Sequence, residues 1–217
     1  IRDRDKGVKG LLAVGAPVPA DNQLFNCLVL LHGGVPVAVV PKSCLPNYGE
    51  FYEKRWFVSA EQAKAETIRF AGEDIPFGNL LFRLNDRAVL GVEICEDLWV
   101  PLPPSTRMAQ AGANVIVNLS ASNELIGKHA YLRSLICQQS ARCMAGYVYA
   151  SSGFGESSTD LVFAGNGIIA ENGNLLAESP RFMMEEQLVI SEIDIDTLQN
   201  DRQVNTSFMY GTSGLPK

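Results

Sequence analysis

The stretch GVEICEDLWVP, residues 91–101, carries an apolar run into an acidic segment that ends in proline. Cys95 stands at this change, and in layered α/β folds the carboxyl ends of strands are where active sites gather. The residue is therefore either a small buried hydrophobe or a nucleophile. Glu93, Glu96 and Asp97 lie within two positions of the thiol, and nearby negative charge raises a thiol's pKa. A reactive Cys95 needs a compensating cation from elsewhere in the fold.

Strand and turn signals continue on both sides of this stretch. Apolar runs separated by polar or glycine-rich turns predict strands, several of them paired as hairpins. They cover residues 10–18, 24–31, 35–42, 80–95 (a hairpin turned at 85–86), 114–122 and 148–155 (each a strand opening into a loop), 165–179 (a hairpin turned at 171–174) and 187–195. Helical signals cover 103–113 and 129–147. This order predicts a single layered α/β (α+β) domain.

Composition excludes several classes of protein. The 217 residues are 47% hydrophobic, which suits one domain with a sizeable core, and a net charge of −6 without a basic cluster argues against nucleic-acid binding. No apolar run approaches the roughly 18 residues that span a bilayer, and no signal peptide is apparent, so we expect no membrane contact and a cytoplasmic location. Five cysteines lack C-x-x-C spacing and only two histidines occur, which argues against a metal site.

Other residues could complete a site around Cys95. Lys42 lies between an apolar run and an aromatic loop, so its ammonium is either a solvated charge or a partly desolvated cation that favours a thiolate. Glu50 and Glu53, in YGEFYEKRWF (48–57), form either surface ion pairs or a pocket wall. The segment NLSASNELIGK (118–128) follows a strand with polar side chains that could line a substrate pocket. A thiol at a strand-to-turn junction is also open to backbone N–H groups, as an oxyanion hole requires.

Three of these segments together resemble a known family. PKSCLPNYGEFYEKRWF (41–57), GVEICEDLW (91–99) and NLSAS (118–122), in this order and at these separations, resemble the nitrilase (carbon–nitrogen hydrolase) superfamily. More narrowly, they look like the glutaminase domains of glutamine-dependent NAD synthetases, and the likeness runs from about residue 11 to about residue 196. The resemblance implies a nitrilase-type four-layer α-β-β-α sandwich, with residues 1–217 forming one domain.

The resemblance also assigns roles to residues. It implies that Cys95 is the nucleophile, that Lys42 stabilises the tetrahedral oxyanion, and that Glu53 supports the triad and orients the lysine. It further implies a glutamine pocket lined by five residues: Tyr48, Glu96, Trp99, Ser122 and Lys128. Neither a metal nor a cofactor is implied in this domain.

The implied activity is hydrolysis of the glutamine side-chain amide through a γ-glutamyl thioester. The ammonia would pass to a synthetase domain in cis, which uses ATP and Mg to make NAD, and the family resemblance also implies a homo-oligomer. The family's general-base glutamate normally lies on an upstream strand, a context that Asp3 and Asp5 lack. An S-G-G-x-D-S synthetase motif is absent as well. We therefore expect a domain truncated at its N-terminus, without the synthetase domain and with little activity alone. A stand-alone amidase and a non-catalytic nitrilase-like module remain as alternatives.

Overall fold

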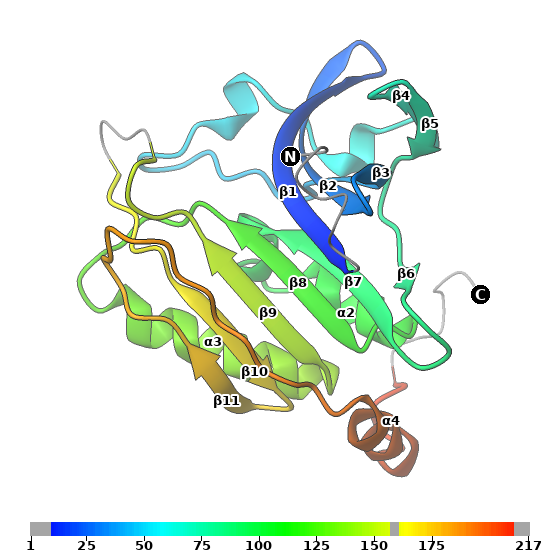
Figure 1. Ribbon diagram of the computed structural model, residues 1–217, viewed down its shortest axis with the longest axis vertical. Helices are drawn as coiled ribbons and strands as arrows, with labels where there is room; N and C mark the ends of the chain where they lie inside the picture. Colours follow the sequence, from blue (N-terminus) through cyan, green and yellow to red (C-terminus); the bar gives the residue numbers. More distant parts are fainter. Residues whose placement is uncertain (1–9, 157–160, 211–217) are drawn as a thin grey trace. The chain divides into compact units, whose positions relative to one another are not determined.

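The computed structural model describes residues 10–156 and 161–210 (Figure 1). The backbone divides into two compact units, residues 1–80 and 81–217, and each has its own β-sheet. Asp3 and Asp5, which the sequence placed in a charged run, lie outside the described residues. Within the described ranges, no helix has the length and apolar character needed to cross a membrane.

The first unit is built on a three-stranded antiparallel sheet. Its strands β1 (Leu11–Ala20), β2 (Gln23–His32) and β3 (Val35–Pro41) lie side by side in sequence order. Asp21 and Asn22 join β1 to β2 with φ values of 52° and 59°, the left-handed conformation that a tight two-residue hairpin requires. The three strands predicted over residues 10–42 are thereby confirmed. A small second hairpin of β4 (Thr67–Phe70) and β5 (Glu73–Pro76) was not predicted.

The core of this unit forms between the sheet and the second hairpin. Phe25 on β2 and Phe77 after β5 pack edge to face, with ring centroids 5.3 Å apart. Val39 bridges to Phe77, which ties β3 to the chain after β5. Strand β2 is buried along most of its length, as its apolar sequence predicts. Beyond β3 the chain enters two short 3₁₀ turns, η1 (Glu53–Arg55) and η2 (Ala60–Gln62).

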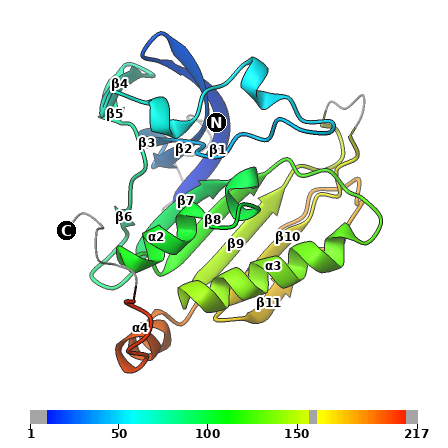
Figure 2. The same cartoon turned by 180° about the vertical axis from the view of Figure 1, so that it is seen from behind.

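The second unit is a six-stranded mixed sheet with helices on one face. The strand order is β11-β10-β9-β8-β7-β6, and β7, β8 and β9 are parallel. The strands are β6 (Phe82–Arg83), β7 (Val89–Ile94), β8 (Val115–Ser120), β9 (Gly146–Ser151), β10 (Gly167–Glu171) and β11 (Asn174–Glu178). Helices α2 (Pro104–Gln110) and α3 (Lys128–Cys143) lie over the same face (Figure 2). These elements confirm both predicted helices and both predicted hairpins of this region, and the mixed α/β fold class with them.

The parallel strands set the position of the candidate site. Because β7, β8 and β9 run in one direction, their carboxyl ends meet at one edge of the sheet. The 3₁₀ turn η3 (Cys95–Leu98) follows β7 at this edge, and the loops after β8 and β9 begin beside it.

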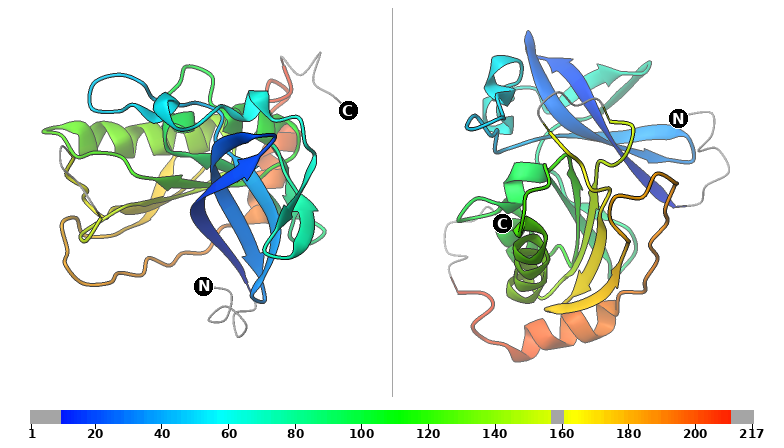
Figure 3. Two further views of the ribbon diagram at one scale, coloured as in Figure 1. Left: turned by 90° about the horizontal axis from the view of Figure 1, so that it is seen from above. Right: turned by 90° about the vertical axis from the view of Figure 1, so that its left-hand side faces the viewer.

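The strand predicted over residues 187–195 is wrong. Residues 187–194 form no strand, and α4 (Ile195–Val204) begins at the last residue of the predicted span. The alternating pattern comes from side-chain packing: a Cβ placed on Gly146 would lie 2.4 Å from Ile193 Cδ1, and one on Gly167 would lie 3.4 Å from Val189 Cγ2. The segment therefore packs over glycines of β9 and β10 without forming a strand of the sheet. Figure 3 (right) shows α3 on one side of this sheet and the extended orange segment on the other.

Helix α4 is held to the rest of its unit by Arg202. The guanidinium donates to the carbonyl oxygens of Ala113 (2.6 Å), Cys143 (2.7 Å) and Met144 (3.1 Å). These carbonyls lie just beyond α2 and at the end of α3, where helical carbonyls lack partners within the helix. Burial lowers the pKa of Arg202 to about 10, which still leaves it charged at neutral pH.

Candidate active site

Cys95 occupies a strained position at the junction of β7 and η3. Its φ is +50°, in the left-handed region that residues other than glycine enter at a cost of roughly 1 kcal/mol or more. Two side chains hold the backbone there: Asn118 Oδ1 accepts the Cys95 N–H (3.1 Å), and Asp97 Oδ2 accepts the Ile94 N–H (2.9 Å). The residue is 8% exposed. A thiol held rigidly at a sharp strand-to-helix turn has the placement that a nucleophile needs.

Lys42 and Glu53 form a buried ion pair in the first unit. Lys42 is fully buried directly after β3, and its Nζ donates to both carboxylate oxygens of Glu53, at 2.7 and 2.9 Å. The Lys42 backbone is fixed by bonds to Asn26 O (2.8 Å) and from Ala60 N (2.9 Å). Of the two interpretations that the sequence left open for these residues, the structure supports the desolvated cation for Lys42. Glu53 faces this cation, with its side chain 22% exposed.

Three residues predicted to bind substrate meet in the second unit. Lys128, at the start of α3, donates from Nζ to Ser122 Oγ at 2.9 Å and lies 4.9 Å from the centroid of the Trp99 ring. Trp99 follows η3, so the contact joins the chain after Cys95 to the loop after β8. Asn123 also accepts from Lys128, through its side chain (2.5 Å) and its carbonyl (3.0 Å). The result is a cation on an aromatic face, surrounded by polar oxygens.

The remaining predicted residues divide between the units. Tyr48 lies in the aromatic loop of the first unit, 60% exposed, with its ring 6.2 Å from that of Phe51. Glu96 is half-buried on η3, next to Cys95. The first unit thus carries Lys42, Tyr48 and Glu53, and the second carries Cys95, Glu96, Trp99, Ser122 and Lys128.

Sequence reasoning missed the partners of Glu93. This carboxyl is 1% exposed and accepts from the Tyr147 hydroxyl and from the Ser105 N–H (2.9 Å). Burial, aided by the charge of Asp97, raises its pKa from 4.5 to about 7, against the lowering effect of the two donors. A signal was present in the sequence, because Asn118 is a polar side chain inside the apolar run VIVNL and such residues need a buried partner.

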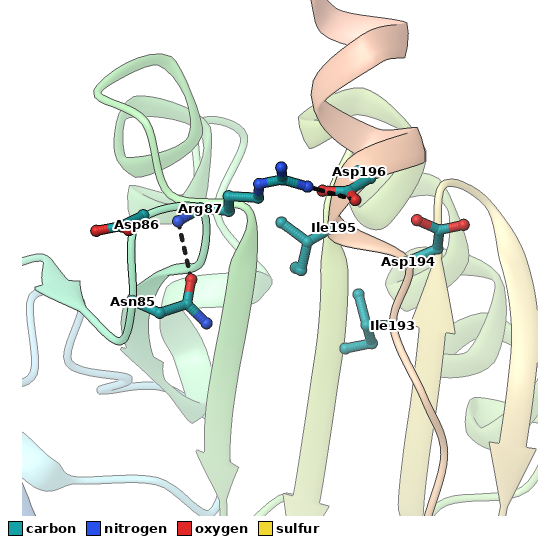
Figure 4. A pocket seen from close by; sticks show the side chains of 7 residues that line it. All are labelled: Asn85, Asp86, Arg87, Ile193, Asp194, Ile195 and Asp196. Carbon is teal, nitrogen blue, oxygen red and sulfur yellow. Dashed lines mark hydrogen bonds and ion pairs between the residues drawn. The ribbon is translucent and has the colours of Figure 1, made fainter.

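A pocket of about 500 Å³ lies away from these residues. Asn85, Asp86, Arg87 and residues 193–196 line it, and the Arg87–Asp196 ion pair closes one side at 2.5 Å (Figure 4). Its first three residues precede β7, whereas Cys95 follows β7, so the six-residue strand separates them by roughly 20 Å. The pocket therefore does not belong to the Cys95 site.

Comparison with known proteins supplies the family. The model of the carbon–nitrogen hydrolase family matches residues 9–203. A glutamine-dependent NAD(+) synthetase of Mycobacterium tuberculosis is 46% identical over 195 residues, which are 88% of this chain and 29% of that protein. The chain therefore spans less than a third of that relative.

Solved structures agree. The glutamine-dependent NAD(+) synthetase from Cytophaga hutchinsonii is 29% identical, with a TM-score of 0.72 over 83% of this chain and 29% of its own. A carbon–nitrogen hydrolase from Helicobacter pylori, 17% identical, has a TM-score of 0.69 over 93% of this chain and 68% of its own, and it supports the fold alone. These similarities confirm the nitrilase-type α/β fold class, and with the family model covering most of its length the chain belongs to the carbon–nitrogen hydrolase family.

Proposed function

We propose that this chain is the glutamine-hydrolysing part of a glutamine-dependent NAD synthetase. The observation that carries the proposal is the 46% identity to the Mycobacterium tuberculosis protein of that name over 88% of the chain. The positive-φ cysteine at the end of β7 supports it, because this is where the sequence resemblance places the nucleophile. The substrate, the product and the use of the ammonia belong to this proposal.

In the proposed reaction the Cys95 thiolate attacks the side-chain carbonyl carbon of glutamine. A C–S bond forms and the carbonyl oxygen becomes an oxyanion in a tetrahedral intermediate. When the carbonyl reforms, the C–N bond breaks and the nitrogen leaves as ammonia after accepting a proton. Water then adds to the γ-glutamyl thioester, and glutamate leaves with restoration of the thiol. The family pattern assigns the thiol proton to a base distinct from Glu53.

Lys42 has the properties of the oxyanion donor in this scheme. Its ammonium is fully buried, and charged donors act most strongly on a developing charge where water is excluded. Glu53 holds Nζ through both of its oxygens, at 2.7 and 2.9 Å, and so fixes the direction in which the remaining N–H points.

Recognition of a zwitterionic amino acid requires charges of both signs. Lys128, held by Ser122 and Trp99, supplies a positive group for the substrate carboxylate. Glu96, adjacent to the nucleophile, supplies a negative group for the α-amino group. The sequence resemblance also assigns substrate binding to Tyr48, an exposed aromatic side chain of the first unit. These assignments keep the roles that the sequence resemblance implies.

The proposal also covers the partners of the domain. Ammonia released at Cys95 would serve a synthetase domain in cis, where ATP and Mg act, and the glutaminase domain itself would need neither. A homo-oligomer and a cytoplasmic location complete the proposal.

A diazoketone analogue of glutamine tests the proposal in the full-length protein. We expect one adduct, located on Cys95 by peptide mass spectrometry, and protection by glutamine. Cys95→Ser should lose at least about 1,000-fold in glutamate production while retaining synthesis of NAD from free ammonia. Ammonia-dependent synthesis is the control measurement, and the substitution itself changes the protein by only one atom.

Each other outcome has a definite meaning. Modification of another residue, or full activity in Cys95→Ser, would overturn the assignment of the nucleophile. Hydrolysis of simple aliphatic amides with no turnover of glutamine would favour the stand-alone amidase. Absence of both an adduct and any amide hydrolysis would favour the non-catalytic module.

A further inference from the structure

A continuous set of buried hydrogen bonds links Glu93 to the backbone of Cys95. The Tyr147 hydroxyl on β9 donates to Glu93 Oε1. Asn118 on β8 donates from Nδ2 to the Tyr147 oxygen at 3.1 Å, and its Oδ1 accepts the Cys95 N–H, also at 3.1 Å. All three side chains are at most 1% exposed. The set therefore crosses the three parallel strands β7, β8 and β9 and ends at the residue proposed as the nucleophile.

With Glu93 charged, the direction of each bond in this set is fixed by chemistry. A tyrosine hydroxyl has one proton, and here it goes to Glu93, so the Tyr147 oxygen must accept from its other neighbour. Only the NH₂ end of the Asn118 amide can donate to it, which turns Oδ1 toward Cys95. The Cys95 N–H, which can only donate, and the Tyr147 oxygen, whose proton goes to Glu93, thus require the same orientation of the Asn118 amide.

We propose that Glu93, Tyr147 and Asn118 are positioning residues that hold Cys95 in its left-handed backbone conformation and so aim its thiol at the substrate. The function of Cys95 as a nucleophile rests on the proposed function above. One consequence concerns the oxyanion: because Asn118 occupies the Cys95 N–H, that N–H is not a donor to the tetrahedral intermediate. The oxyanion must then be held by other donors, among which Lys42 is already proposed.

A second asparagine in the same unit provides an internal control. Asn114 precedes β8, is 1% exposed, accepts the Val89 N–H at 2.9 Å and donates to Arg87 O at 2.7 Å. It therefore performs at the start of β7 the same chemistry that Asn118 performs at its end. The difference is that Asn114 bonds only to backbone groups, whereas Asn118 also connects to Glu93 through Tyr147.

Glu93 makes this set sensitive to pH. The groups that face its carboxyl are Asp97 of η3, Tyr147 of β9, Cys143 of α3 and the Ser105 N–H of α2. With a pKa raised to about 7, chiefly by burial, Glu93 changes its charge in the physiological range. A charged carboxylate accepts more strongly than a neutral acid, so the bond from Tyr147 is expected to tighten as the pH rises through about 7.

The test compares the variants Asn118→Ala, Tyr147→Phe and Asn114→Ala in the full-length protein. The first measurement is the rate of Cys95 alkylation by iodoacetamide, followed by peptide mass spectrometry because Cys44 and Cys137, which are half-buried, can react as well. We expect at least tenfold slower alkylation in Asn118→Ala and about threefold slower alkylation in Tyr147→Phe. The rate in Asn114→Ala should stay within twofold of the native value.

The second measurement separates kcat from KM for glutamine. Positioning of the nucleophile predicts a fall in kcat for Asn118→Ala and Tyr147→Phe, with KM changed by less than about twofold. Glu93→Gln should remove the inflection near pH 7 from the alkylation profile, since the titrating carboxyl is gone.

Alkylation needs no glutamine, so it is informative even if the protein hydrolyses another amide. The proposal is overturned if Asn118→Ala and Asn114→Ala alter Cys95 alkylation equally, which would show a loss of general packing only. If Asn118→Ala fails to fold, Tyr147→Phe decides, because it removes one oxygen and keeps the ring. An unchanged alkylation rate and kcat in that variant would equally exclude the proposal.

Discussion

Lys42 in the first unit and Glu93 in the second are both buried ionisable groups, but Lys42 has a partner of opposite charge and Glu93 has neutral hydrogen-bond donors. Lys42 is fully buried against the carboxylate of Glu53, a partner of opposite charge. Glu93 is 1% exposed and is bonded by neutral donors, the Tyr147 hydroxyl and the Ser105 N–H. The first arrangement keeps two charges together, whereas the second raises the pKa of the acid to about 7.

The difference teaches how burial acts on an ionisable group. Desolvation disfavours the charged form of either residue, and only nearby charge or hydrogen bonds oppose it. An opposite charge at 2.7 Å provides a strong Coulombic partner for Lys42. Two neutral donors provide less to Glu93, and the neighbouring Asp97 adds a repulsion. Lys42, held in an ion pair, suits an oxyanion donor, and Glu93 suits a group that titrates.

The largest expected effect comes from removing the partner of Lys42. Glu53→Ala leaves a fully buried ammonium without its counter-charge, which costs about 3 kcal/mol in the free energy of unfolding. This is the lower end of the usual range, because the Glu53 side chain is 22% exposed and water can enter in its place. Urea unfolding of the protein measures the loss.

Two variants control this prediction. Glu53→Gln keeps an acceptor for Lys42 but removes the charge, so its cost should lie between those of the native protein and Glu53→Ala. Asp74→Asn removes the carboxylate of the Arg69–Asp74 pair, whose side chains are 68% and 67% exposed, and should cost less than about 0.5 kcal/mol. Equal losses in Glu53→Ala and Asp74→Asn would show that the buried Lys42–Glu53 pair contributes no more to the free energy of unfolding than an exposed ion pair does.

The sequence indicates the environment of Lys42 but does not by itself identify its partner. The run before Lys42 is apolar and the run after it aromatic, which left a partly desolvated cation as one of two interpretations. The partner could not be deduced from spacing, because Glu50 and Glu53 both lie in the same loop. The choice depends on the turn η1, which begins at Glu53.

The same limit applies to Glu93 and to the end of the chain. Tyr147 lies 54 positions from Glu93 and meets it only because β7 and β9 flank β8, an order that local patterns do not determine. Alternation over residues 187–195 predicted a strand. The actual cause is the packing of Val189 and Ile193 over two strand glycines, which produces the same period without ladder bonds.

Arg202 gives the second largest expected effect, and it tests whether neutral partners can hold a half-buried charge. Unlike Glu93 it keeps its charge at neutral pH, since burial lowers its pKa only to about 10. Arg202→Met keeps the length of the side chain but frees the carbonyls of Ala113, Cys143 and Met144. We expect a loss of about 2–3 kcal/mol in the free energy of unfolding.

Arg142, exposed in the last turn of α3, is the matched control for Arg202. Arg142→Met should change the free energy of unfolding by less than about 0.5 kcal/mol. A similar small change in Arg202→Met would mean that water satisfies its carbonyl partners equally well. The hydrogen bonds from Arg202 to these carbonyls would then contribute little to the free energy of unfolding.

The pH dependence of stability gives the smallest effect and the most direct test of Glu93. Between its ordinary pKa of 4.5 and its native value of about 7, the folded protein keeps a proton that the unfolded chain has lost. Because the unfolded state binds fewer protons in this window, the free energy of unfolding falls as the pH rises. The contribution of Glu93 is complete below about pH 4.5, disappears as the pH passes about 7, and changes the free energy of unfolding by at most about 1.4 kcal/mol per pH unit.

Urea unfolding at pH 5, 6, 7 and 8 measures this slope in the native protein and in Glu93→Gln. Other titrating groups contribute equally to both proteins, so the difference between the two curves isolates Glu93. The native protein should lose stability relative to the variant as the pH rises, most steeply between pH 5 and 7. Parallel curves would mean that Tyr147 and Ser105 stabilise the carboxylate as fully as water does, and the pKa of Glu93 would then not be raised by burial.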